Sequence, residues 1–255
     1  MSARVAGVRA LETRLVGTET AIVPYLTGGY PSLPAFSEAL LALSRISIAV
    51  EIGIPFSDPM ADGATIQESS RVALENGATL ESILVAMEDL GGLDADLVVM
   101  SYLNPLLAYG YASLLPRLAG VGVSALVVPD LPLEESDELA AVSRGHGIGL
   151  VQLVSPVTSQ ERLEALGSAS EGFTYAVTMT GTTGGTVGAG PEVTAYLDRV
   201  RTASRAPVLA GFGVRTANQV RALAPHCDGV IVGSALVEVM SAGRDPVSFV
   251  AELRQ

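Results

Sequence analysis

Eight short apolar runs recur along this chain, and they constrain its fold more than any other feature. They cover residues 21–27, 48–54, 96–102, 125–128, 149–154, 173–177, 207–211 and 229–233. Between them, apolar residues recur with helical spacing over 33–43, 79–90, 134–143, 191–203 and 216–224. Runs that are apolar throughout, rather than alternating with polar residues, indicate parallel strands covered by helices.

Eight strand–helix units predict that the strands close into a (β/α)₈ TIM barrel. The alternative is an open doubly wound sheet, but eight units within 255 residues, with glycines clustered after the last strands, fit the closed form better. No linker rich in Pro, Ser or charge divides the chain. We therefore expect a single α/β domain over residues 1–255, with a short helical extension over about residues 1–17.

Composition favours a soluble enzyme domain. Hydrophobic residues make up 49% of the chain, which allows a large core. The formal net charge of −12 argues against a nucleic-acid partner, because Lys and Arg bind phosphate backbones. The single cysteine, Cys227, suits a reducing cytoplasm. We expect a cytoplasmic protein with no secretion signal near its start and no membrane span.

Two carboxylates eleven positions apart carry the strongest indication of chemistry. Glu51 lies in an apolar run, so its side chain is expected in a closed interior, where a carboxylate is costly unless it is paired or used. Asp62 follows on a loop that Pro55, Pro59 and Gly63 interrupt. Two acids in different surroundings can hold different protonation states at one pH, as acid–base catalysis requires.

Glycines after the last strands predict a phosphate site. In a (β/α)₈ barrel the active site lies at the carboxyl ends of the strands. Thr183, Gly184 and Gly185 follow the sixth run, Gly213 follows the seventh, and Gly233 and Ser234 follow the eighth. Glycine lets backbone N–H groups approach an anion closely, and Ser234 is expected to cap the helix that follows it. A phosphate could thus be bound without lysine.

Long motifs in this chain resemble those of the tryptophan synthase α-subunit family. The resemblance runs from about Ile22 to Val237, and it is carried by PYLTGGYPS, EIGIPFSDPMADGATIQ, MSYLNPLLAYG, VPDLPLEES, TYAVTMTGTTG, GFGV and DGVIVGSAL, in the order and spacing of the family. Members of that family are (β/α)₈ barrels that cleave indole-3-glycerol phosphate into indole and glyceraldehyde 3-phosphate. The resemblance therefore implies a lyase.

The resemblance also implies roles for individual residues. Glu51 would be the general acid–base, Asp62 would face the indole nitrogen, and Tyr175 would lie beside the reacting carbons. The retro-aldol cleavage needs a proton at C3 of the indole ring and the loss of a proton from the neighbouring hydroxyl. The residues that we expect to contact the substrate are Tyr102, Leu103, Thr183, Gly184, Gly185, Phe212, Gly213, Gly233 and Ser234.

A partner is implied in the same way. In the family, the loops after the second and third strands dock on a β subunit that uses pyridoxal phosphate, and the complex is α₂β₂. The matching residues here are Ser57, Asp58, Pro59, Asn104 and Pro105. The cofactor is expected only in the β subunit, because this sequence offers no lysine context for it.

Several alternatives stay open at the level of the sequence. The chain could be a self-sufficient indole-3-glycerol phosphate lyase that releases free indole. It could also be a catalytically weak barrel that activates a β subunit, or another phosphate-binding barrel such as a sugar-phosphate isomerase. Asp58 could be a turn residue, and the glycines could serve tight turns alone. His226 beside Cys227 has no further ligands at useful spacing, so we expect no metal site.

Overall fold

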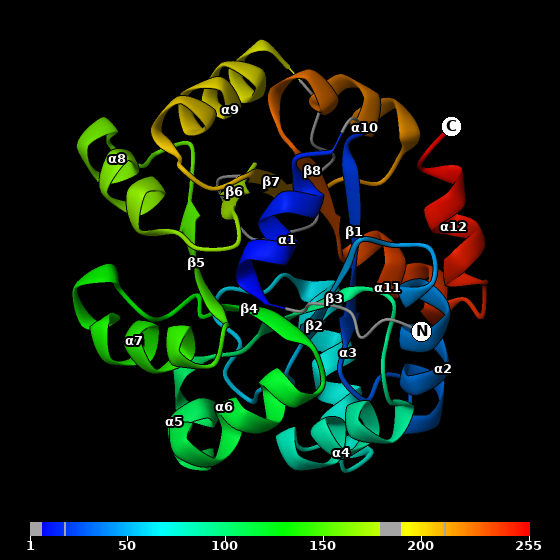
Figure 1. Cartoon of the computed structure of the whole chain (residues 1–255). Helices are drawn as coiled ribbons and strands as arrows, with labels where there is room; N and C mark the ends of the chain where they lie inside the picture. The colour runs from blue at the N-terminus through cyan, green and yellow to red at the C-terminus, as the bar shows by residue number, and fades with distance from the viewer. Residues whose placement is uncertain (1–6, 18, 179–189, 212) are drawn as a thin grey trace.

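The computed structural model describes residues 7–17, 19–178, 190–211 and 213–255. Eight parallel strands form a closed barrel in chain order, and β8 pairs with β1 to complete it (Figure 1). The strands are β1 (Ala21–Thr27), β2 (Ala49–Gly53), β3 (Asp96–Met100), β4 (Val123–Val127), β5 (Gly149–Val154), β6 (Thr174–Val177), β7 (Val208–Gly211) and β8 (Gly229–Val232). The predicted barrel is confirmed, and the open sheet is wrong because β1 and β8 are hydrogen-bonded to each other.

Helices surround the barrel and follow its strands along the chain (Figure 1). They are α1 (Val8–Leu15), α2 (Leu33–Ser44), α3 (Ala64–Glu75), α4 (Leu80–Leu90), α5 (Leu103–Tyr109), α6 (Tyr111–Gly120), α7 (Asp137–Gly145), α8 (Gln160–Ala169), α9 (Pro191–Ala203), α10 (Ala217–Leu223), α11 (Ser234–Ser241) and α12 (Pro246–Glu252). The helices predicted over 33–43, 79–90, 191–203 and 216–224 agree with α2, α4, α9 and α10 to within one residue at each end. Among the helices of the described ranges, none is long and apolar enough to cross a membrane.

Three predicted boundaries are wrong. The strand predicted from residue 125 begins at Val123, and the other two differ for local reasons. The helix predicted over 134–143 begins only at Asp137, because residues 133–135 form a separate 3₁₀ turn. The strand predicted over 96–102 ends at Met100, since Tyr102 already precedes the first residue of α5. Both differences lie at the carboxyl ends of strands or in the loops after them, where the chain turns into the next helix.

The strands are buried along almost their whole length. Every residue of β1, β2, β3, β4, β7 and β8 is buried, as expected for parallel strands with side chains in the barrel and side chains under the helices. The helices bury one face each; in α2, Phe36, Leu40 and Leu43 are fully buried. Each such side chain contributes roughly 1.5–3 kcal/mol by leaving water.

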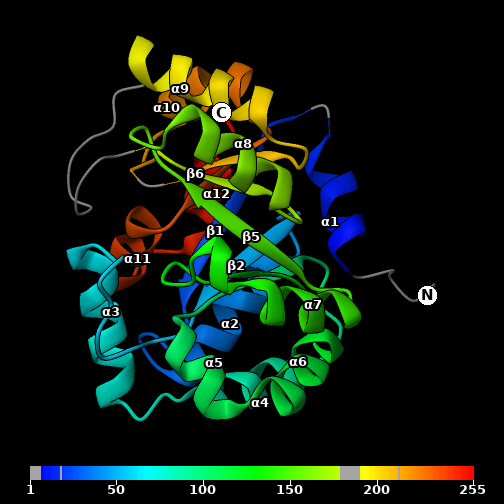
Figure 2. The same cartoon turned by 90° about the vertical axis from the view of Figure 1, so that its left-hand side faces the viewer.

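Helix α1 lies at the amino-terminal end of the barrel, on the side opposite to α3 (Figure 2). Leu11 and Leu15 of this helix are fully buried. Arg14 forms an ion pair with Asp96, the first residue of β3, and Ser124 Oγ donates a 2.8 Å hydrogen bond to the same carboxylate. The helix falls within the extension predicted over about residues 1–17, and it leaves the carboxyl ends of the strands open.

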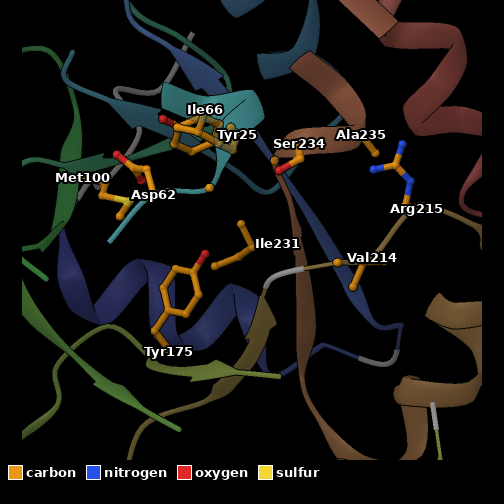
Figure 3. Close-up of a pocket in the computed structure, with 13 residues that line it drawn as sticks. Tyr25, Asp62, Ile66, Met100, Tyr175, Val214, Arg215, Ile231, Ser234 and Ala235 are labelled. Carbon is orange, nitrogen blue, oxygen red and sulfur yellow. The ribbon is translucent and has the colours of Figure 1, made fainter. Parts of the chain in front are cut away.

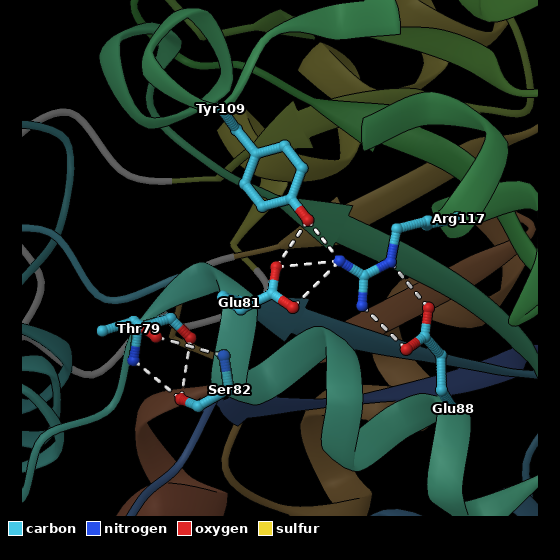
Figure 4. Close-up of polar contacts among 6 residues, drawn as sticks. All are labelled: Thr79, Glu81, Ser82, Glu88, Tyr109 and Arg117. Carbon is cyan, nitrogen blue, oxygen red and sulfur yellow. Dashed lines mark hydrogen bonds and ion pairs between the residues drawn. The ribbon is translucent and has the colours of Figure 1, made fainter. Parts of the chain in front are cut away.

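A polar network ties α4, α5 and α6 together (Figure 4). The guanidinium of Arg117 on α6 donates to Glu81 and Glu88 of α4, at 2.8 Å in each case. Tyr109, at the end of α5, contacts both Arg117 and Glu81. Thr79 and Ser82 form a reciprocal capping box that begins α4. Helix α5, which follows β3 at the mouth of the barrel, is thereby held against two neighbours.

Candidate active site

Glu51 lies in the middle of β2 and is completely buried. It is in register with Tyr25 of β1 and Val98 of β3, and neither of its carboxylate oxygens has a hydrogen-bond partner among the described residues. Burial, with the charge of Asp62 as a second cause, raises the pKa of Glu51 from 4.5 to about 8. The carboxyl group is therefore mostly protonated at neutral pH.

Asp62 lies on the loop between β2 and α3 and is half-buried. The hydroxyl of Tyr102 donates a 3.2 Å hydrogen bond to Asp62 Oδ2, and the same hydroxyl accepts the N–H of Ala61 at 2.9 Å. Partial burial raises the pKa of Asp62 to about 6, and the Tyr102 hydrogen bond opposes that rise. At neutral pH the two acids thus differ, with Glu51 protonated and Asp62 ionised.

Two buried tyrosines lie close enough to these acids for the acids' charges to raise their pKa values. Tyr25 is on β1 and Tyr175 is on β6, and both are almost fully buried. Burial raises the pKa of Tyr175, and the charges of Glu51 and Asp62 raise it further. Because β2 and β6 lie on different sides of the barrel, their side chains can interact only through its interior. Sequence reasoning missed Tyr25, although its register with Glu51 follows from parallel pairing of the first two strands.

Two glycines make room for the tyrosine rings. A Cβ atom at Gly53 would overlap the Tyr25 ring and hydroxyl, and one at Gly211 would overlap the Tyr175 ring. Any larger residue at either position would push a tyrosine off its present rotamer. These two glycines therefore shape the interior of the barrel, rather than serving turns.

A pocket opens beside Asp62 and the two tyrosines (Figure 3), and Glu51 is not among the described residues that line it. The empty space there is about 520 Å³, part of which is open solvent at the pocket mouth. Asp62 and Met100 lie on one side of it, and Val214, Arg215 and Ala235 lie on the other. The thirteen described residues that line it are Tyr25, Asp62, Gly63, Ile66, Met100, Tyr175, Gly213, Val214, Arg215, Ile231, Gly233, Ser234 and Ala235.

Two glycines and the start of a helix also line the pocket. Gly213 has a φ of 89°, a left-handed conformation that favours glycine. Helix α11 begins at Ser234, and its N-terminus carries a partial positive charge. The expectation that Ser234 caps this helix is wrong: Gly233 is the N-cap, and Ser234 is already the first helical residue. Within the part of the chain that the structure describes, no side chain caps the first N–H groups of α11.

Other predicted site residues lie outside the pocket wall. Tyr102 acts through its hydrogen bond to Asp62, and Leu103 is half-buried at the start of α5, where its N–H donates to Asp130 at 2.9 Å. Thr183, Gly184, Gly185 and Phe212 fall outside the described residues. Sequence reasoning also missed Arg215, which follows the GFG motif by two positions and lines the pocket.

The predicted docking residues lie on the surface near the barrel mouth. Ser57, Asp58 and Asn104 are exposed, while Pro59 and Pro105 are half-buried. Two large apolar side chains stand beside them: Met60 is 80% exposed and Leu107 is 55% exposed. Within the described residues, no group of three or more His, Cys, Asp or Glu side chains could hold a metal ion.

Comparison with known proteins gives a consistent result. The family model described as tryptophan synthase alpha chain matches residues 12–254. The tryptophan synthase alpha chain of Bacillus cereus is 39% identical over 236 residues, which is 92% of each chain. That of Carboxydothermus hydrogenoformans is 41% identical over 224 residues, covering 87% of this chain and 84% of the relative.

Solved structures agree with the sequence relatives. A chain from a study of mutual activation in the tryptophan synthase α₂β₂ complex of Pyrococcus furiosus has a TM-score of 0.85 and 36% identity; the match covers 92% of this chain and 98% of that one. A chain of Mycobacterium tuberculosis tryptophan synthase, in an open form with BRD0059 bound, has a TM-score of 0.84 and 33% identity, over 96% and 95% of the two chains.

Proposed function

Since the chain belongs to the tryptophan synthase alpha chain family, we propose roles for its own residues in the reaction of that family. The enzyme is a lyase that cleaves indole-3-glycerol phosphate into indole and glyceraldehyde 3-phosphate. Its partner is a tryptophan synthase β subunit in an α₂β₂ complex, which uses the indole to make L-tryptophan.

Glu51 is the general acid and base. As a protonated acid it delivers a proton to C3 of the indole ring, which makes the ring an electron acceptor. The carboxylate that results takes the proton from the hydroxyl on the carbon attached to C3. That oxygen becomes the aldehyde, the bond between C3 and the carbon breaks, and its electron pair restores the aromatic ring. Glu51 gives one proton to C3 and takes one from the hydroxyl, so it ends the reaction in its starting protonation state and no other proton donor or acceptor is needed.

Asp62 stabilises the positive charge that develops on the ring. When C3 is protonated, the indole nitrogen becomes iminium-like, and an ionised carboxylate that accepts the ring N–H stabilises this charge. The Tyr102 hydroxyl supports the role, because its hydrogen bond favours the ionised form of Asp62. The different proton states of Glu51 and Asp62 thus match their different tasks.

Tyr175 and Tyr25 shape the reacting end of the pocket. Both rings are buried and line the pocket, whereas Glu51 is fully buried and is not among the described residues that line it. A dry surrounding keeps the pKa of Glu51 high, which favours its action as an acid. Gly213, Gly233 and Ser234 bind the phosphate through backbone N–H groups at the opposite end.

Pyridoxal phosphate belongs to the β subunit in this proposal. The cofactor is normally held as a Schiff base with a lysine, and all 15 basic Lys and Arg residues of this chain are arginines. The docking surface is formed by residues 57–60 and by the exposed side of α5, where Met60 and Leu107 supply apolar area. A single cysteine and an acidic composition support a cytoplasmic location.

One observation carries these assignments: the Glu51 carboxyl group is buried in the barrel interior with no hydrogen-bond partner among the described residues, close enough to Asp62 for the charge of that carboxylate to raise its pKa. The test is indole release from indole-3-glycerol phosphate, with and without a β subunit. Glu51→Gln should lower kcat by about a thousandfold or more with little change in substrate affinity. Asp62→Asn should also lower kcat severely. Glu68→Gln, on the exposed face of α3, is the matched control.

The outcomes separate the alternatives. Slow release that a β subunit accelerates supports the synthase, whereas fast release by the isolated chain would indicate a self-sufficient lyase. No release, with activation of the β subunit retained, would leave only the regulatory role. Cleavage near the wild-type rate in Glu51→Gln would remove that residue from its role.

A further inference from the structure

Arg215 is the one cationic side chain among the described residues that line the pocket. It lies on the loop between β7 and α10, two residues after Gly213, and its side chain is 37% exposed. Its guanidinium makes a bidentate ion pair with Glu238 of α11, and one of the two contacts is 3.2 Å long. Its backbone N–H donates to Gln219 Oε1 at 2.8 Å, which holds the loop in place.

The ion pair lies one helical turn from the proposed phosphate site. Ser234 is the first residue of α11, and Glu238 is four residues further, so the two side chains share a face of the helix about one turn apart. Arg215 lines the pocket together with Ser234 and Ala235, on the side away from Asp62 (Figure 3). The path from Glu238 to the start of α11 is thus about one helical turn, or roughly 5.4 Å.

The charge of the protein makes such a cation useful. The net charge is −12, so the molecule as a whole repels a phosphate dianion. Backbone N–H groups bring only partial charges, whereas a guanidinium brings a full one and can bind two phosphate oxygens at once. The Glu238 carboxylate pairs with both terminal nitrogens of the guanidinium, and Thr65 of α3 donates a further hydrogen bond of 3.5 Å to this carboxylate.

We infer that Arg215 is a substrate-binding residue that exchanges Glu238 for the phosphate of the substrate. This inference rests on the proposed function, because it assumes that the phosphate lies at Gly213, Gly233 and Ser234. The exchange replaces one charge-assisted pair with another, so binding gains a cation without leaving Glu238 wholly unpartnered. The competing explanation is that Arg215 only neutralises Glu238, which would otherwise repel the phosphate.

A pair of indole ligands separates phosphate recognition from ring recognition. The probes are 3-(indol-3-yl)propan-1-ol and its phosphate ester, used as inhibitors of indole release by the α₂β₂ complex. Arg215→Ala should weaken the ester about tenfold, equivalent to about 1.4 kcal/mol, and leave the alcohol unchanged. KM for indole-3-glycerol phosphate should rise by a similar factor with kcat nearly constant, because ground state and transition state lose the same contact. Equal weakening of both ligands would overturn the inference.

The double variant decides between binding and neutralisation. If Arg215 binds the phosphate, the double variant Arg215→Ala/Glu238→Gln should bind the ester almost as weakly as Arg215→Ala alone. If Arg215 only neutralises Glu238, the double variant returns to wild-type affinity, and the inference is wrong. Glu238→Gln alone should bind the ester more tightly than wild type, since the guanidinium is no longer held. Arg244→Ala removes a surface arginine that pairs with Glu252 of α12, and it should leave the affinities for the ester and the alcohol unchanged.

Failure of the inference can be told apart from failure of the proposed function. If the wild-type complex releases no indole and binds neither ligand, the proposed function is wrong. If the wild type is active and Arg215→Ala binds the ester as tightly as wild type, only the inference is wrong. Thermal unfolding of each variant shows whether the barrel is intact. Arg215→Lys keeps the positive charge but loses the bidentate geometry of the guanidinium, so its affinity for the ester should lie between those of wild type and Arg215→Ala.

Discussion

Replacing Glu51 by glutamine should stabilise the folded protein by an amount that grows with pH. In the folded state the pKa of Glu51 is about 8, because the carboxyl is fully buried and close to Asp62, whereas its ordinary value is 4.5. Between these two values the folded protein keeps a proton that the unfolded chain has lost. Its free energy of unfolding therefore falls as pH rises through this interval. Glutamine has the same shape and no charge to lose.

The size of the effect follows from the difference between the two pKa values. A difference of about 3.5 corresponds to roughly 5 kcal/mol above pH 8, and to roughly 3 kcal/mol at pH 7. Below pH 4.5 both side chains are neutral, so the difference between wild type and variant at that pH measures only the exchange of a carboxyl for an amide. The quantity of interest is the increase above this baseline.

Urea unfolding of wild type and Glu51→Gln at pH 4, 7 and 8.5 measures that increase. The m-values should agree, since the folded and unfolded states keep the same surface areas. Glu68→Gln is the control: its carboxylate is exposed beside Arg71, its pKa lies below 4.5, and the difference from wild type should be flat above pH 5. A difference for Glu51→Gln that is equally flat would refute the reasoning, because it would mean that Glu51 is ionised in the folded protein throughout.

Three further predictions test the site and its surroundings. The rate of indole release should rise with pH through about 6, as Asp62 ionises, and fall through about 8, as Glu51 loses its proton; a pH-rate profile measures both, and Asp62→Asn should remove the acidic limb. Gly211→Ala should lower kcat more than tenfold and cost about 1–3 kcal/mol of stability, because the added methyl overlaps the ring of Tyr175; unchanged kinetics and urea midpoint would contradict this role. Met60→Asp should weaken binding of the β subunit about tenfold without altering indole release by the isolated chain, as seen by titrating one subunit with the other, since a charge in an apolar contact must be desolvated. An unchanged titration curve would place the docking surface elsewhere.

Much of the fold can be read from the sequence because its information is local. A parallel strand buried on both faces needs a continuous apolar run, and a covering helix needs apolar residues at helical spacing, so both patterns are written in adjacent residues. The α9 helix was predicted over residues 191–203 and has those bounds. Where local conformation competes, as in the 3₁₀ turn before α7, the pattern alone predicts the wrong boundary.

The sequence by itself also determined that Glu51 is a buried acid, because it lies within a continuous apolar run and such runs form strands that are buried on both faces. Its proton state depends first on complete burial, which closure of the barrel produces, and then on the charge of Asp62 on the loop after β2. Only the tertiary structure shows that Tyr25 and Arg215 line the pocket, because the residues around them come from distant parts of the chain. The register of paired strands decides which side chains point into the closed barrel. Packing of the loop after β7 against α11 decides the ion pair that holds the Arg215 guanidinium beside the start of that helix.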